Sequence, residues 1–140
     1  MLGSLAKLCA GLVISMAPPQ PETPPEPAPA LHPIEARVIE RTNVQRARFG
    51  LRPLVVDLRL LRSARRHTAW MTNNRSMVHT NQPVGENIAM GQNSSGEVMN
   101  SWMDSPGHRA NILNPGYTRI GVAAYAAPNG TIYWCQQFLQ

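Results

Sequence analysis

Residues 101–113 read SWMDSPGHRANIL, and this stretch joins the end of one predicted helix to the turn that follows it. The apolar run around Trp102 predicts a helix whose large aromatic side chain is anchored in the core. Pro106 and Gly107 then turn the chain, because both residues interrupt a helix. Ile112 and Leu113 are expected to bury the other side of this turn. His108 is left on the opposite side, either as the cap of a short helical turn or as a residue with a chemical role.

Two longer helices are predicted upstream of this stretch. Pro33 suits a first helical position, and apolar residues recur at helical spacing through 34–49 until Gly50, a residue typical of helix ends. Asp57 predicts the N-cap of a second helix over 58–71. One face of that helix carries Leu60, Ala64, His67 and Met71. We therefore interpret His67 as a hydrogen-bonded core residue and not as a ligand.

The segments around residues 101–113 complete an α+β pattern. Residues 73–87 are polar and predict a loop, and Ser94 with Glu97 has the S-x-x-E spacing of a capping box ahead of residues 98–103. Apolar alternation on both sides of Asn129-Gly130 predicts a β-hairpin. Three to four helices on a small antiparallel sheet are therefore expected.

The amino-terminal residues differ in composition from the rest. Residues 1–17 contain a short apolar run that predicts a signal peptide or an N-terminal anchor. Residues 18–30 hold seven of the 13 prolines and predict an extended linker. The folded domain is then residues 31–140. Its single cysteine, Cys135, allows no internal disulfide and is expected in a buried strand.

The charge of the chain favours anionic surroundings. Thirteen basic residues against eight acidic ones give a net charge of +5, and all but one of the basic residues are arginines. Such a balance suits an anionic lipid or a wall polymer. Most of the arginines are spread over 37–75 with few aromatic residues between them, so we interpret them as solvated helix faces and expect no nucleic-acid partner.

Four stretches in the same order resemble the CAP superfamily (cysteine-rich secretory proteins, antigen 5 and pathogenesis-related proteins), in its short bacterial SCP-like form. They are NVQRARFGLRPL at 43–54, LLRSARRHTAWM at 60–71, MVHTNQPVGENIAMG at 77–91 and SWMDSPGHRANILNPGYTRIGVAAY at 101–125. The resemblance implies an α-β-α sandwich and a secreted or cell-envelope location. We assign structural roles to the matched Asn43, Arg46 and Trp102.

The resemblance also implies a cleft built from two histidines and two glutamates. His79, Glu86 and His108 match three of these positions, whereas the fourth falls on Ser105, with Asp104 beside it. Glu97 lies near the start of the predicted helix and is interpreted as a capping residue. Each matched residue also has an ordinary structural alternative, in which Glu86 and His79 bind backbone groups and His108 caps a helix.

Two imidazoles and one carboxylate are common ligands of zinc or another divalent metal. Three functions stay open at this point. The first, which we favour, is a monomeric binding module for a wall, lipid or host-surface ligand, with a metal in its cleft. The second is a metal-dependent hydrolase or peptidase, and the third is a non-catalytic structural protein of the envelope.

Overall fold

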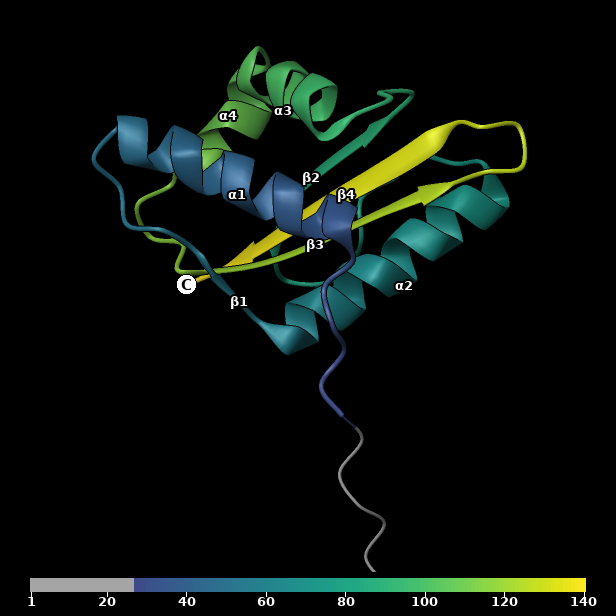
Figure 1. Cartoon of the computed structure of the whole chain (residues 1–140), viewed down its shortest axis with the longest axis horizontal. Helices are drawn as coiled ribbons and strands as arrows, with labels where there is room; N and C mark the ends of the chain where they lie inside the picture. The colour runs from purple at the N-terminus through teal and green to yellow at the C-terminus, as the bar shows by residue number, and fades with distance from the viewer. Residues whose placement is uncertain (1–26) are drawn as a thin grey trace, which may run out of the picture.

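The computed structural model describes residues 27–140, which form a three-layer α-β-α sandwich (Figure 1). The predictions made for residues 1–17, and for 18–26 of the linker, lie outside the described residues. Among the described residues, no helix has both the length and the apolar character needed to cross a membrane. The predicted α+β fold is confirmed.

The central layer is a four-stranded sheet in the order β1-β3-β4-β2. Its strands are β1 (Val55–Val56), β2 (Gly85–Met90), β3 (Arg119–Ala126) and β4 (Ile132–Leu139). The predicted hairpin is the β3–β4 pair, and β2 pairs with β4 in antiparallel register. The sheet is mixed and not purely antiparallel, because the two-residue β1 pairs in parallel with β3.

Helices cover both faces of the sheet, with α1 (Pro33–Arg48), α3 (Ser95–Met103) and α4 (Pro106–Ile112) on one face and α2 (Leu58–Asn74) on the other (Figure 1). Strand alternation sends neighbouring residues into different cores. Val122 and Trp134 pack toward α1 and α3, whereas Ala123 and Cys135 pack toward α2. Cys135 is fully buried in β4, as predicted.

Helices α1, α2 and α3 begin at the predicted residues, whereas Pro106 and Gly107, expected to turn the chain, open the short helix α4. Pro33 opens α1, and the Asp57 side chain accepts hydrogen bonds from the backbone N–H groups of Arg59 and Leu60 at the start of α2. The Ser94 side chain accepts one from Glu97 N at the start of α3. These caps satisfy N–H groups that have no partner within the helix.

Gly121 in β3 lets α2 approach the sheet closely. A Cβ atom at this position would overlap the backbone of Leu60 and Leu61. The position therefore requires a residue without a side chain, and the packing of α2 against the sheet depends on it.

Arg46 connects α1 to two loops and to the end of α4, although it is only 1% exposed. Its guanidinium donates to the carbonyl oxygens of Arg52, Ile112, Asn114 and Tyr117 at 2.9–3.2 Å. The Asn43 side chain, one turn earlier, both donates to and accepts from the backbone of Leu54. Both residues thus hold irregular segments against α1.

Arg65 of α2 reaches around the sheet to the start of α1. It donates to both carboxylate oxygens of the buried Glu35 at 2.7–2.8 Å and to the carbonyl oxygen of Ala30 at 2.7 Å. The same carboxylate accepts from His32 N at 2.8 Å. This cluster, which we call the Arg65 clasp, fixes the point at which the chain enters the domain.

The prediction of a loop over 73–87 is wrong at both ends. α2 continues to Asn74, and β2 begins at Gly85. Strand β2 escaped prediction because its first buried side chains, Glu86 and Asn87, are polar and give no apolar alternation.

Candidate functional site

The candidate site lies at the edge strand β2, around the buried carboxylate of Glu86. Glu86 is paired with Gln137 of β4, and its side chain points to the α2 face of the sheet together with Cys135. Its Oε1 atom accepts from Thr80 N at 2.9 Å and lies 2.8 Å from His79 Nδ1. Its Oε2 atom accepts from Gln137 Nε2 at 2.9 Å. Protein donors therefore engage both carboxylate oxygens.

His79 lies in the loop that follows α2 and remains largely open to solvent, with 61% of its side chain exposed. Because its Nδ1 atom is held by Glu86, the ring presents Nε2 outward. A carboxylate bound to one ring nitrogen fixes the orientation of the imidazole and makes the other nitrogen a better ligand.

His108 lies in α4 and approaches the same region from the opposite side of β2. Its carbonyl oxygen accepts from Asn87 Nδ2 at 3.1 Å. Its Nδ1 atom is buried and has no hydrogen-bond partner among residues 27–140. Burial, and secondarily the charge of His79, lowers the pKa of His108. The imidazole is thus neutral at neutral pH, which is the form that binds metals.

Side chains from α3 and α4 fix these helices against β2 and thereby position His108. Asn111 donates to the carbonyl oxygen of Glu86 at 3.2 Å and to Asn87 Oδ1 at 2.9 Å. Trp102 donates from its indole nitrogen to the carbonyl oxygen of Ile88 at 3.2 Å. These bonds satisfy outward carbonyls of an edge strand that would otherwise lack partners.

The remaining predicted positions lie elsewhere. Ser105 is the N-cap of α4 and Asp104 the C-cap of α3, and in residues 27–140 neither hydrogen-bonds to Glu86 or to a site histidine. Glu97 lies at the start of α3, where its carboxylate accepts from Asn93 N at 2.9 Å. It therefore takes part in capping.

Three residues of the site were missed in the sequence. His67 Nε2 lies 4.0 Å from Glu86 Oε1 and 2.7 Å from the carbonyl oxygen of Val78, so its ring bridges α2 and the loop. Gln137 and Cys135 contact Glu86 from β4. The two adjacent glutamines, Gln136 and Gln137, inside an otherwise apolar strand were the available signal, since buried amides need polar partners.

The Cys135 thiol does not supply a nucleophile. Burial raises its pKa well above the usual range, and the neighbouring Glu86 carboxylate raises it further. The reactive form of cysteine is the thiolate, which this environment disfavours.

The donor atoms fit a metal ion only in part. Within residues 27–140, no three His, Cys, Asp or Glu side chains are grouped closely enough to hold one ion. His79 and His108 offer ring nitrogens, and the unpartnered Nδ1 of His108 fits a ligand role. Glu86 fits the outer position that orients His79, because its oxygens are already engaged.

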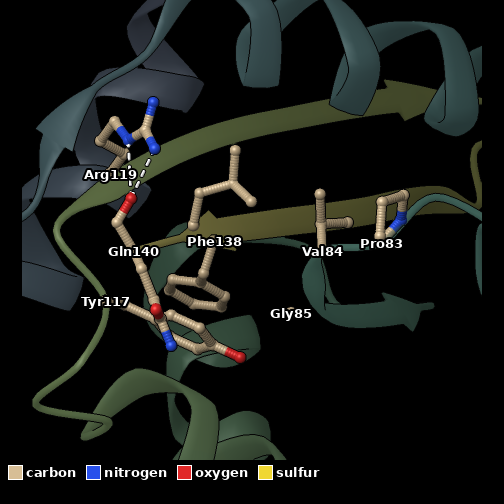
Figure 2. A pocket seen from close by; sticks show the side chains of 8 residues that line it. Pro83, Val84, Gly85, Tyr117, Arg119, Phe138 and Gln140 are labelled. Atoms are coloured by element: carbon tan, nitrogen blue, oxygen red, sulfur yellow. Dashed lines mark hydrogen bonds between the residues drawn. The ribbon is translucent and has the colours of Figure 1, made fainter.

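A hollow of about 510 Å³ is lined by Gly85, the residue before Glu86, and by residues of β3 and β4 (Figure 2). Its wall is the Tyr117 ring, stacked on Phe138 at 5.3 Å between centroids. Arg119, the charged side chain in this hollow, already donates hydrogen bonds to Asp57 and to the carbonyl oxygen of Gln140. The hollow therefore offers shape but no free reactive group, and Glu86 remains the centre of the candidate site.

The sequence profile of the cysteine-rich secretory protein family (CAP) matches residues 39–138. Uncharacterized protein YkwD of Bacillus subtilis is 38% identical over 122 residues, which are 75% of this chain and 46% of that protein. The chain thus spans about half the length of this curated relative.

Solved structures with the same fold include two bacterial proteins. An extracellular protein of Bacillus anthracis that contains an SCP domain has a TM-score of 0.69 and 25% identity, over 80% of this chain and 45% of that one. An outer surface protein of Borrelia burgdorferi has a TM-score of 0.67 and 20% identity, over 72% of this chain and 87% of that one.

Proposed function

Because the chain belongs to the cysteine-rich secretory protein (CAP) family, we propose that it is an extracellular or envelope binding module. In this proposal His79 and His108 hold a divalent metal ion, Glu86 orients His79, and the ion lies beside the site of an extracellular ligand. The observation that carries the proposal is the pair of ring nitrogens left for a ligand, Nε2 of His79 and the unpartnered Nδ1 of His108.

The chemistry of the pair favours zinc or a similar borderline metal. Neutral imidazoles are good ligands for such ions, and the lowered pKa of His108 keeps its ring neutral. A bound ion would polarise a carbonyl or water oxygen placed on it. Glu86 would hold the His79 ring in the orientation that presents Nε2 to the ion.

Binding is better supported than hydrolysis. The site contains one carboxylate, Glu86, and Thr80, His79 and Gln137 engage its two oxygens. A general base needs a free lone pair within reach of a water molecule, and Glu86 has little capacity left for that role. The thiol of Cys135 is protonated.

An extracellular setting is supported by two independent features. Residues 1–30 combine the leader-like and proline-rich segments. In addition, an extracellular protein and an outer surface protein share the fold. A fusion of residues 1–30 to a reporter enzyme that is active only outside the cytoplasm should show activity in bacteria, and an inactive fusion would contradict this part.

Calorimetric titration of zinc into the full chain tests the metal site. We expect binding by the parent protein and its loss in His79→Ala and His108→Ala. The matched control is His32→Ala, which removes a histidine at the N-cap of α1, away from the site. The absence of heat from the parent protein, or an equal loss in His32→Ala, would overturn the proposal.

A further inference from the structure

The outer face of α2 carries an exposed tryptophan, Trp70, next to the candidate site. Trp102 and Trp134 are buried, whereas Trp70 is 47% exposed. Its ring is parallel to that of His67 within 4°, with 6.2 Å between the centroids. An exposed tryptophan held flat by a neighbouring ring offers a rigid apolar surface at little entropic cost.

Trp70 forms one side of a small hollow with polar walls. The hollow measures about 250 Å³ and is lined by Ser63, Arg66, His67, Trp70, Thr80 and Gln82. Two of these residues, His67 and Thr80, also lie against Glu86, at 4.0 Å and 2.9 Å from its Oε1 atom. The Trp70 hollow is therefore continuous with the residues of the candidate site.

A row of arginines leads along α2 to this hollow. Arg59, Arg62, Arg66 and Trp70 are all exposed and recur every three or four residues, so they share one face of the helix. The row spans about 16 Å at the rise of an α-helix. Helix α2 contains no acidic residue. Within residues 27–140, Asp57 pairs with Arg59, whereas Arg62 and Arg66 have no carboxylate partner.

These features together select a ligand class. A flat aromatic ring pairs well with the C–H face of a sugar ring, while the surrounding hydroxyl, amide and guanidinium groups bind its oxygens. Unpaired guanidinium groups in a row attract carboxylate or phosphate groups repeated along a chain. Single-stranded nucleic acid is less suited, because its binding sites present successive aromatic platforms and this face presents one.

We propose that Trp70, Arg62 and Arg66 form a binding track for an acidic glycan, a chain of sugars that carries repeated carboxylate or phosphate groups. This inference rests on the proposed binding function and names the class of its extracellular ligand. One sugar ring lies on Trp70 in the hollow, and the acidic groups of the following sugars pair with the arginines.

The test measures binding of the full chain to a short polygalacturonate oligomer by calorimetry and by the fluorescence of the exposed tryptophan. Comparison probes are a neutral maltooligosaccharide of equal length, inorganic polyphosphate and a single-stranded oligonucleotide. We expect polygalacturonate to bind most tightly. Trp70→Ala should weaken it about tenfold or more, the usual effect of truncating an anchoring tryptophan. Trp70→Phe should restore part of the loss.

A charge-matched control separates the track from general attraction. The double variant Arg62→Gln/Arg66→Gln should weaken binding and flatten its salt dependence. Arg37→Gln/Arg48→Gln removes the same charge from the exposed face of α1 and should have a much smaller effect. Equal losses in the two double variants, no effect of Trp70→Ala, or tighter binding of polyphosphate or the oligonucleotide would each overturn the proposal.

Zinc titration of the same variants separates this inference from the proposed metal site. Trp70→Ala should bind zinc like the parent protein. Retained zinc binding without glycan binding would refute the track alone, and the reverse result would refute the metal site alone.

Discussion

Replacing Arg46 by methionine should be among the most damaging single changes in the domain. Methionine keeps most of the volume of the side chain but removes four donors at once. The carbonyl oxygens of Arg52, Ile112, Asn114 and Tyr117 then lose their partner. Burial lowers the pKa of the guanidinium, although arginine remains charged at any ordinary pH.

The size of the stability loss depends on which of the four carbonyl oxygens water can reach in the variant. A hydrogen bond to a charged group contributes about 1.5–3 kcal/mol, and an abandoned buried acceptor costs about 1–3 kcal/mol. The bond to Ile112 is fully buried, whereas the other three are partly accessible and regain water. We therefore expect Arg46→Met to lower the free energy of unfolding by about 3–5 kcal/mol.

Urea unfolding of the full chain, followed by far-UV circular dichroism, measures this loss. Arg48→Met on the exposed side of the same helix is the matched control and should change the free energy of unfolding by less than about 0.5 kcal/mol. Arg46→Lys should fall between the two, because an ammonium group reaches fewer carbonyls. If Arg46→Met cost no more than Arg48→Met, the reasoning about these four bonds would be wrong.

Three further outcomes follow from contacts described above. Gly121→Ala should lower the free energy of unfolding by about 1–3 kcal/mol or more, since the new methyl group meets the backbone of Leu60. A melting temperature within about a degree or two of wild type corresponds to only about a few tenths of a kcal/mol and would contradict the close approach of α2 to the sheet. Partial burial raises the pKa of the Asp57 carboxyl, but the N–H groups of Leu60 and Arg59, the charge of Arg59 and the bond from Arg119 together lower the net pKa. A lowered folded-state pKa stabilises the protein above the unfolded value of about 3.9 and ceases to do so as the pH falls through the folded value. Asp57→Asn keeps the cap without the charge, so wild type should be more stable at pH 7 and should lose that advantage in unfolding measurements below about pH 4. Cys135 should react with an aromatic disulfide reagent only after the protein is unfolded, because burial and Glu86 raise its pKa; rapid reaction of the native protein would show that the thiol is exposed.

The helices were predictable because their signals are local. Pro33, Asp57 and Ser94 act on residues within one turn of themselves, so the sequence around each is sufficient to identify the start of a helix. Strand β2 was not predictable in the same way. Glu86 and Asn87 are buried through hydrogen bonds to residues far along the chain, and that information is absent from the apolar pattern of the strand.

The same limit applies to the candidate site. His79 and Glu86 were identified through the resemblance, and they lie seven residues apart in direct contact. His67 and Gln137 were not identified, since their proximity to Glu86 depends on how α2 and β4 pack on β2. Helical spacing placed His67 on the buried face but gave no information about the residue opposite to it.

The Arg65 clasp determines how mechanical load enters the domain. Tension that arrives from the segment preceding Ala30 meets a guanidinium that grips the Ala30 carbonyl and the Glu35 carboxylate at once. Since Glu35 lies in the first turn of α1 and Arg65 in α2, the pull is shared by the two outer layers at that first turn. A protein tethered through this segment would therefore resist peeling of its first helix, and its sheet would stay shielded while the attachment is under strain.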